Sequence, residues 1–217
     1  TWITIANYQK YGSVDKPNTK YNADWGTLNG EEFNMKRNFY HKPIGSINWD
    51  WKINETTKLS TVFYGSWGRG GGTSGAGGAL GNNYLSAAFK TANGLVDYDK
   101  IVAWNSGQPV TINGVTKTRT QSTSPSNSIP SPYTGFINTS STGSATNTTT
   151  GFSRTSSMNS HDWYGGIISL NKKLSKSFVL DFGLDARTYK GYHYTNINSL
   201  LGAGAFLDNT DANNPNR

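Results

Sequence analysis

The chain has 217 residues, a net charge of +7 from 20 basic and 13 acidic side chains, and a mean hydropathy of −0.59. It has no cysteine, which excludes disulfides and thiolate metal sites. The sequence has no run of 18 apolar residues, so it predicts no transmembrane helix. Its Lys and Arg residues are scattered, whereas a nucleic-acid-binding protein concentrates them in a basic stripe. A transmembrane β-barrel fits this composition, because only alternate strand residues of a barrel meet lipid.

The first predicted element is a weak strand over TWITIANY (1–8). A clearer strand covers 38–54, where apolar and polar residues alternate from Ile47 onward, as the two faces of a strand require. Residues 54–57 are of types that favour a turn, and 58–68 is predicted as the second strand of a hairpin. Both strands carry their apolar side chains at odd numbers, so these side chains are predicted to share one face of the hairpin.

The connection 69–159 is long and polar. Its Gly-rich beginning (68–81) predicts a flexible stretch, and 116–150, which is rich in Ser, Thr, Asn and Pro, predicts an irregular one. Short helices are predicted between them over 82–93 and 97–105, the second capped by Asp97. We expect this loop to fold back on itself. Its aromatic residues Tyr84, Tyr98 and Trp104 are candidates for contact with a ligand.

The most informative stretch is 177–194, which follows a less certain strand at 160–171 and a charged turn at 172–176. Apolar side chains occupy its even positions from Phe178 to Ala186, and charged side chains occupy several odd ones. The alternation continues for roughly twice the 5–6 residues of an ordinary strand. Length and pattern together are typical of a strand that crosses an outer membrane.

Connection lengths give the predicted strands a direction. The turns at 54–57 and 172–176 are short, whereas the connections at 12–37, 69–159 and 195–217 are long. Outer-membrane barrels have short periplasmic turns and long extracellular loops. Strands 1–11, 58–68 and 177–194 would therefore run outward, and 38–53 and 160–171 inward. The sequence predicts an all-β fold, namely a segment of a large antiparallel transmembrane β-barrel with long extracellular loops.

The alternation also predicts what each face meets. The predicted membrane-facing and girdle residues are Trp49, Trp51, Phe63, Trp67, Phe178, Leu180, Phe182 and Leu184. The predicted lumen-facing polar residues are Asn48, Asp50, Asp181, Asp185 and Arg187, either as lining that docks an internal plug or as a substrate path. Asp185 and Arg187 are close enough along the strand to pair. Trp67, Trp163, Tyr189 and Tyr192 are expected near the outer rim.

No constellation of residues points to catalysis, to a cofactor or to a metal ion. Asp181 and Asp185 would lie about 13 Å apart along a strand, which is too far for a catalytic pair of carboxyl groups. The histidines His41, His161 and His193 have none of the usual ligand spacings. We therefore do not expect an enzyme. A soluble β-sandwich also alternates, but its strands and connections are shorter.

Several phrases resemble barrel segments of TonB-dependent receptors, especially the Oar-like and SusC-like ones: NWDWKINETTKLSTVFYGSWGRGGG, WYGGIISLNKKLSKSFVLDFGLDARTYKGYHY and INSLLGAGAFLDNTDANNP. The insert GLVDYDKIVAWN resembles inserts in the extracellular loops of that family. The resemblance implies a barrel of about 22 strands with a plugged lumen, in the outer membrane of a Gram-negative bacterium. It also implies energised uptake of a large ligand.

The resemblance further implies partners. These are the lipid bilayer with its lipopolysaccharide, a TonB-type energy-transducing complex contacted through a missing part of the chain, and a surface lipoprotein as a further candidate. No nucleic acid is expected. About five strands cannot close a barrel, so residues 1–217 are expected to be part of a longer polypeptide. Two alternatives stay open: a receptor-like barrel that serves as a structural scaffold of a larger outer-membrane complex, and a secreted carbohydrate-binding β-module.

Overall fold

The computed structural model describes residues 3–120, 136–138, 142–207 and 213. Strands predominate and the helices are short, so the predicted all-β class is confirmed. The chain divides into two compact units. Unit 1 comprises Thr1–Arg37, Thr73–Ser156 and Asn196–Arg217, and unit 2 comprises Asn38–Gly72 and Ser157–Thr195.

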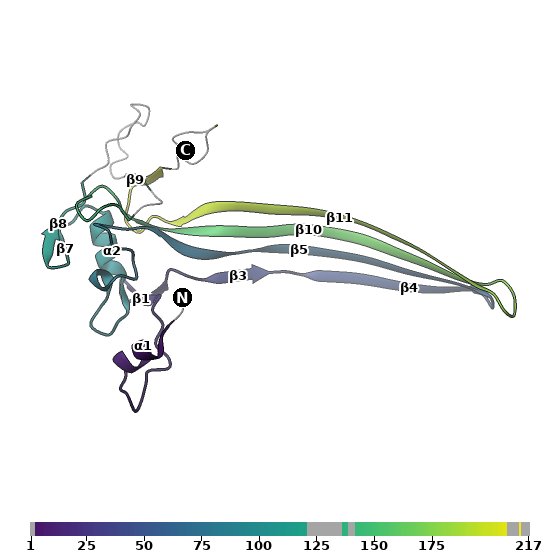
Figure 1. Cartoon of the computed structure of the whole chain (residues 1–217). Helices are drawn as coiled ribbons and strands as arrows, with labels where there is room; N and C mark the ends of the chain where they lie inside the picture. The colour runs from purple at the N-terminus through teal and green to yellow at the C-terminus, as the bar shows by residue number, and fades with distance from the viewer. Residues whose placement is uncertain (1–2, 121–135, 139–141, 208–212, 214–217) are drawn as a thin grey trace. The chain divides into compact units, whose positions relative to one another are not determined.

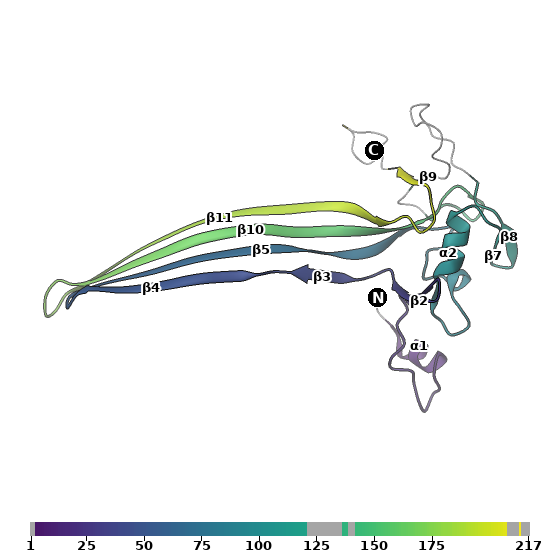
Figure 2. The same cartoon turned by 180° about the vertical axis from the view of Figure 1, so that it is seen from behind.

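Unit 2 contains most of the three longest strands of the chain and two shorter ones, and these strands lie side by side in both ribbon views (Figures 1 and 2). These are β3 (Asn38–His41), β4 (Ile44–Asn54), β5 (Thr57–Gly77), β10 (Phe152–Lys173) and β11 (Val179–Ser199). β10 lies between β5 and β11, while β3 and β4 pair one after the other with the other edge of β5. The predicted strand 38–54 is therefore interrupted at Lys42 and Pro43, where proline has no N–H to donate to a ladder.

The first predicted hairpin is confirmed, with its register. β4 and β5 are antiparallel, and Ile47 lies opposite Phe63 and Trp51 opposite Leu59. The tight turn is closed by the Asn54 side chain, whose Oδ1 accepts hydrogen bonds from the backbone N and from Oγ1 of Thr56, each at 3.0 Å. An irregularity between Lys52 and Asn54 fits this turn to the register, so odd-numbered residues face odd-numbered ones.

The second predicted hairpin is also present, and its strands are longer than the sequence indicated. Its turn is closed by a hydrogen bond of 2.9 Å from Leu174 N to Phe178 O. The two short turns share one end of unit 2, because Lys173 N donates to Thr56 O at 2.8 Å. Figure 1 shows both turns at the same end of the ribbons. This agrees with the expectation that short turns lie on one side of the sheet.

The prediction of a flexible Gly-rich stretch at 68–81 is wrong for most of its length, because β5 continues through it to Gly77. Gly70 and Gly71 pair with Tyr40 and Phe39 of β3. A Cβ atom on Gly71 would lie 2.5 Å from the carbonyl oxygen of Ser157, so this glycine permits a close approach of backbones. Here glycine serves strand packing, whereas composition alone suggested a linker.

The weak strand predicted over 1–8 is also wrong. Residues 1–2 lie outside the described residues, and Ile5–Lys10 forms the helix α1. Thr4 is its N-cap, and its Oγ1 accepts a hydrogen bond from Asn7 N at 3.3 Å. A side-chain oxygen at this position satisfies an N–H group that the first helical turn leaves without a partner. This local cap outweighs the short alternation of apolar residues in the sequence.

Unit 1 contains a folded core made from the long connections. Its further elements are β1 (Trp25–Leu28), β2 (Glu31–Asn34), η1 (Ala87–Phe89), β6 (Val96–Asp97), α2 (Tyr98–Asn105), β7 (Val110–Ile112), β8 (Val115–Lys117), β9 (Phe136–Asn138) and β12 (Ala205–Leu207). β1 pairs antiparallel with β2 and parallel with β6. Phe89, Tyr98, Ile101 and Trp104 are fully buried members of one apolar cluster. The expectation that the loop folds back on itself is confirmed.

The second predicted helix is confirmed with its cap, since the Asp97 side chain accepts a hydrogen bond from Lys100 N. The helix predicted over 82–93 is reduced to the single turn η1. Residues 142–151 are irregular as predicted, whereas 121–135 and 139–141 lie outside the described residues. The prediction for 116–150 is thus confirmed only in part, because β8 overlaps its beginning and β9 falls within it.

Asn105, at the end of α2, joins segments that are far apart in the sequence. Its Nδ2 donates to the carbonyl oxygens of Phe152 and Leu201 at 2.8 and 2.9 Å, and its Oδ1 accepts from Phe152 N at 2.9 Å. One buried amide therefore holds the helix, the beginning of β10 and the residues after β11 together within unit 1. A buried amide with every group paired specifies such an arrangement, since unpaired groups there would be costly.

Candidate functional site

One face of the unit 2 sheet consists of exposed apolar side chains. Its most exposed members are Ile47, Trp49, Trp51, Ile53, Phe63, Trp67, Tyr164, Ile168, Phe178, Leu180, Phe182 and Leu184. The exposed fractions reach 71% for Ile47 and Phe178, and they are 62% for Phe182 and 55% for Phe63. All eight predicted membrane-facing residues belong to this set. We call it the apolar face.

Contacts across the strands show that the apolar face is continuous. The rings of Trp67 and Tyr164 meet edge to face with centroids 5.4 Å apart, and a Cβ atom on Gly166 would lie 3.2 Å from the ring of Phe63. Phe63 in turn lies opposite Ile47. β11 joins through its even positions, because Tyr192 Oη donates to Asp162 Oδ2 on β10 at 2.9 Å. Soluble monomers rarely expose so large a contiguous apolar patch, so this face is expected to be covered.

The opposite face of the sheet carries the five residues predicted to face a lumen. Ser60 Oγ donates to Asp50 at 2.5 Å, and Lys58 lies 3.3 Å from the same carboxylate. On the second hairpin, Asn171 Nδ2 donates to Asp181 at 2.5 Å. The predicted pairing of Asp185 with Arg187 is confirmed at 3.3 Å. Asn48, opposite Val62, completes the set. We call this the polar face, and its place in a lumen stays a prediction.

Charged residues end the apolar face at both of its limits. On the side away from the short turns, Arg69 pairs with Asp162 at 2.6 Å, and the Arg69 guanidinium lies 5.6 Å from the ring centroid of Tyr192. On the turn side, Lys172 occupies the same face of β10 by alternation. On β11 the even-numbered Lys190 lies on the same face beside the first limit, since its Nζ is 5.1 Å from the ring centroid of Tyr192. Between these charged residues and Lys172, each position of this face on the four described strands holds an uncharged residue. A band of apolar residues is thus bordered by charge on both sides.

Two aromatic residues expected near the outer rim belong to the polar face instead. Trp163 meets Tyr64 edge to face at 5.9 Å and Tyr189 at 6.4 Å. Odd positions of β10 and β11 face away from the apolar side chains, so Trp163 and Tyr189 do not contribute to a lipid-facing girdle. Trp67 and Tyr192 keep their expected face. Their odd positions already indicate this face in the sequence, whereas the contacts of Trp163 with Tyr64 and Tyr189 depend on the pairing between strands, which the sequence does not give.

The prediction that Tyr84, Tyr98 and Trp104 contact a ligand is wrong, because all three are buried in the core of unit 1. Tyr98 and Trp104 have no exposed surface, and Tyr84 has 7%. Tyr84 Oη donates to Asp24 Oδ1 at 2.5 Å, and Tyr98 Oη donates to Asp24 O at 2.6 Å. Trp104 Nε1 donates to Thr150 O at 2.9 Å. Their polar atoms form hydrogen bonds within the fold, so these three side chains stabilise unit 1.

Burial of these tyrosines predicts a loss of stability in alkali. Desolvation raises the pKa of Tyr21 to about 12, and it raises the pKa of Tyr84 and of Tyr98 far above the ordinary value. The folded chain therefore keeps protons that the unfolded chain loses near pH 10, and the free energy of unfolding falls as pH rises beyond that value. Phenolate absorbance at 295 nm should show these tyrosines ionising only as unit 1 unfolds. Uniform ionisation of all 12 tyrosines near pH 10 would contradict the burial.

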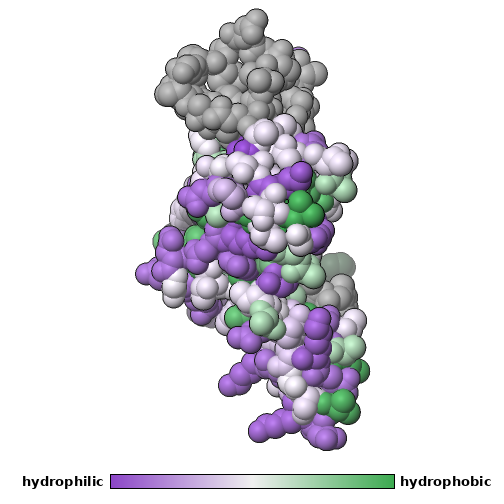
Figure 3. All heavy atoms as spheres, turned by 90° about the vertical axis from the view of Figure 1, so that its left-hand side faces the viewer, coloured by the Kyte–Doolittle hydropathy of each residue, from purple (hydrophilic) through white to green (hydrophobic). Residues whose placement is uncertain are grey.

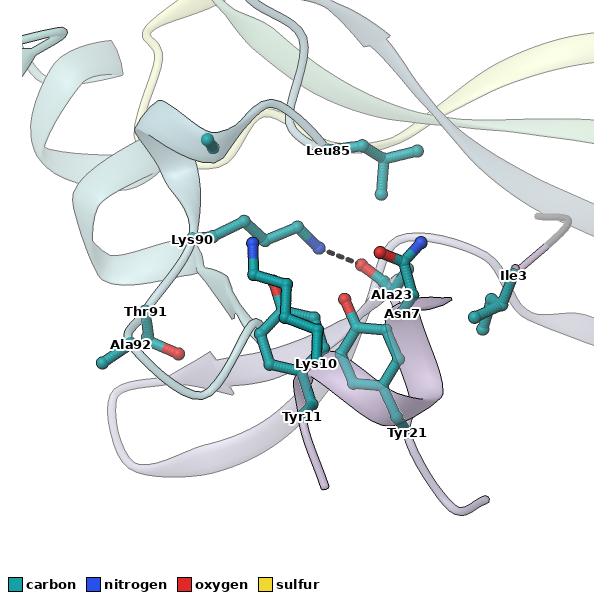
Figure 4. A pocket seen from close by; sticks show the side chains of 11 residues that line it. Ile3, Asn7, Lys10, Tyr11, Tyr21, Ala23, Leu85, Lys90, Thr91 and Ala92 are labelled. Atoms are coloured by element: carbon teal, nitrogen blue, oxygen red, sulfur yellow. Dashed lines mark hydrogen bonds between the residues drawn. The ribbon is translucent and has the colours of Figure 1, made fainter. Parts of the chain in front are cut away.

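A second candidate site is a hollow of about 390 Å³ in unit 1, beside α1 (Figure 4). Lys10 and Lys90 line it, and the ring of Tyr11 packs 4.4 Å from that of Tyr21. Lys90 Nζ donates to Ala23 O. Burial lowers the pKa of Lys90 to about 8, with a smaller opposing effect of Asp24, so its ammonium stays protonated at neutral pH. Sequence reasoning missed this hollow because it assigned 1–8 to a strand and 12–37 to a plain connection.

The described residues also bear on metal sites, membrane-spanning helices and the histidines. They contain no group of three His, Asp or Glu side chains able to hold a metal ion. No helix in the described part of the chain is long and apolar enough to span a bilayer. His41 and His161 lie on different strands of unit 2, and His161 Nε2 lies 3.4 Å from Ser66 Oγ.

Comparison with known proteins adds little. No family model matches the chain, and no curated protein matches it. Among solved structures, a membrane pore of Gasdermin A3 is similar over 75% of this chain, with 7% sequence identity and a TM-score of 0.21. The match spans 58% of the Gasdermin A3 chain, which is less than two thirds of its length. At this TM-score the similarity carries no argument about fold or function.

Proposed function

We propose that unit 2 is part of the wall of an outer-membrane β-barrel of the TonB-dependent receptor type. The observation that carries the proposal is the apolar face, whose exposed side chains continue across four neighbouring strands. In lipid this face is favourable, because its side chains leave water without needing a protein partner. The polar face would then line the lumen, as the alternation of barrel strands requires.

The length of the apolar face supports a membrane in particular. On β10 its charged limits, Asp162 and Lys172, are ten residues apart. At a rise of about 3.4 Å per residue this is about 34 Å along the strand. A tilt of about 40° reduces it to about 26 Å, close to the band of about 25 Å on outer-membrane barrels. A soluble partner surface would impose no such length.

The edge strands of the sheet would need further strands as partners in a membrane. β11 and the β3–β4 edge each have one neighbour in the described sheet. Backbone groups without partners in hydrocarbon cost several kcal/mol each, so both edges would pair with other strands of the barrel. β5, β10 and β11 all continue into unit 1 at the end away from the short turns. The segments of unit 1 are the long connections between these strands, so they would be extracellular.

The proposed activity is energised uptake of a large ligand, in which the polar face contacts an internal plug. A TonB-type complex and a surface lipoprotein are proposed partners, and the outer membrane of a Gram-negative bacterium is the proposed location. The support for these finer points is the resemblance of the strand segments to TonB-dependent receptors. The test distinguishes this proposal from two alternatives: a receptor-like barrel that serves as a structural scaffold, and a secreted carbohydrate-binding β-module.

Fractionation of cells that make the full-length protein tests the proposal. We expect the protein in the outer-membrane fraction, insoluble without detergent, and we expect loss of the TonB-type complex to abolish its ligand-dependent growth as deletion of the protein does. A protein that stays in solution without detergent would overturn the membrane assignment. An outer-membrane protein whose ligand-dependent growth is independent of the TonB-type complex would overturn the uptake mechanism.

A further inference from the structure

Two hollows of unit 1 share the packed rings of Tyr11 and Tyr21 as part of their lining. The first has a volume of about 390 Å³ and the second about 530 Å³. Lys10 and Ala92 line both. Pockets of a few hundred Å³ are of the size that holds a small ligand. We refer to them together as the double hollow.

The double hollow is positively charged. Lys90 lines the first hollow, Lys20 lines the second, and Lys10 lines both. Among the described residues that line them, none is Asp or Glu. Figure 4 shows Lys10 and Lys90 reaching into the first hollow from α1 and from the segment after η1. Ammonium groups that converge in a hollow favour an anionic ligand, because charge-assisted hydrogen bonds are about twice as strong as neutral ones.

The remaining lining combines aromatic rings with side-chain amides. Trp25, 41% exposed, lines the second hollow, and Tyr11 lines both. Asn18 Oδ1 accepts from Lys20 N at 3.2 Å, and Asn22 Oδ1 accepts from Asp24 N at 3.0 Å. These bonds engage the oxygens in turns, so the two amides offer NH₂ donors to a ligand. Rings that pack against C–H groups and amides that bind hydroxyl oxygens suit a sugar better than a peptide.

One side of unit 1 is seen in Figure 3. In Figure 3 the side of unit 1 turned to the viewer is mostly hydrophilic or neutral, with hydrophobic residues in small separate patches. The side seen there shows no single large apolar area of the kind that a protein partner covers. A small soluble ligand is therefore the better match for a polar hollow in this unit.

We propose that the double hollow binds an acidic oligosaccharide, with Lys10 and Lys90 on a carboxylate group and Tyr11 and Trp25 against sugar rings. Its role as the first binding step of uptake rests on the proposed function, which it extends by giving the ligand a chemical class. The binding itself concerns unit 1 alone. The site therefore keeps its ligand whether or not unit 2 lies in a membrane.

Calorimetric titration of the full-length protein in detergent tests the proposal. The probes are trigalacturonate and neutral galactotriose, which differ in the carboxylates. We expect trigalacturonate to bind and galactotriose to bind at least tenfold more weakly. Lys10→Gln, at an exposed residue, and Lys90→Gln should each weaken trigalacturonate binding about tenfold, the size of one charge-assisted hydrogen bond. Lys117→Gln, at an exposed lysine of the same unit outside the double hollow, should leave it unchanged.

Three results would overturn the proposal: equal affinity for both probes, unchanged affinity in Lys10→Gln, or tighter binding of a poly-glutamate peptide than of trigalacturonate. Lys10 carries the test if Lys90→Gln fails to fold, because Lys10 is exposed. Failure of this proposal is distinguishable from failure of the proposed function. If the protein is soluble and binds trigalacturonate, the binding-site proposal stands and the membrane proposal fails. If it lies in the outer membrane and has no affinity for trigalacturonate, the membrane proposal stands and the binding-site proposal fails.

Discussion

If the apolar face lies in lipid as proposed, Ile168→Arg is expected to destabilise the inserted protein by about 2–4 kcal/mol, the cost of an arginine on the lipid face of a barrel near the bilayer midplane. Ile168 lies on the apolar face of β10, about midway between its charged limits Asp162 and Lys172. The guanidinium would enter hydrocarbon without a partner. Urea unfolding of the full-length protein in phospholipid vesicles, followed by tryptophan fluorescence, measures the loss.

Ser169→Arg is the matched control, since the neighbouring residue has the same depth and the opposite face. On the proposed lumen side an arginine stays hydrated, so we expect a change of about 1 kcal/mol or less. Ile168 and Ser169 are both exposed in the isolated sheet. Equal effects of the two substitutions would therefore mean that the apolar face meets water or a polar partner in place of lipid.

Trp104→Ala is expected to cost unit 1 about 3–5 kcal/mol, the usual range for removing a large aromatic side chain from a core. Trp104 has no exposed surface, and its loss also leaves Thr150 O without the indole N–H that it accepts at 2.9 Å. Hydrogen exchange of the α2 amides should accelerate strongly, because local unfolding becomes more frequent. The strands of unit 2 should keep their protection.

Trp25→Ala is the control for this experiment. Trp25 belongs to the same unit and is 41% exposed, so its removal should cost about 1 kcal/mol or less. If Trp104→Ala cost unit 1 no more than Trp25→Ala, Trp104 would not be part of a buried core and the account of that core would be wrong.

The sheet of unit 2 is predictable from sequence because its signal is local. In β11 the alternation around Phe182 assigns each side chain to a face, and in β4 and β5 the shared odd parity of Trp51 and Leu59 indicates the register. A shift of one residue would exchange the two faces, so a strong alternation determines both at once. The confirmed pair of Asp185 and Arg187 follows from the same reasoning.

Unit 1 is less predictable from sequence, because its structure depends on contacts between segments that are distant in the sequence. Tyr98 is buried against the backbone of Asp24 and Met35, which lie more than 60 positions earlier in the sequence. Local composition cannot distinguish an aromatic residue in such a core from one that is offered to a ligand. The glycines from Gly70 to Gly72 likewise read as a linker until their pairing with β3 is known.

The most direct test of the proposal that one face of this sheet lies in lipid is a cysteine scan of Leu180–Asp185 in the full-length protein in lipid vesicles. The described sequence has no cysteine of its own, so each introduced thiol is labelled without competition from these 217 residues. With a spin label at each position, collision with oxygen, which partitions into lipid, is compared with collision with a water-soluble nickel chelate. We predict high oxygen accessibility at 180, 182 and 184, and high nickel accessibility at 181, 183 and 185. Accessibility that does not alternate, or alternates in the opposite phase, would contradict a sheet with one face in lipid.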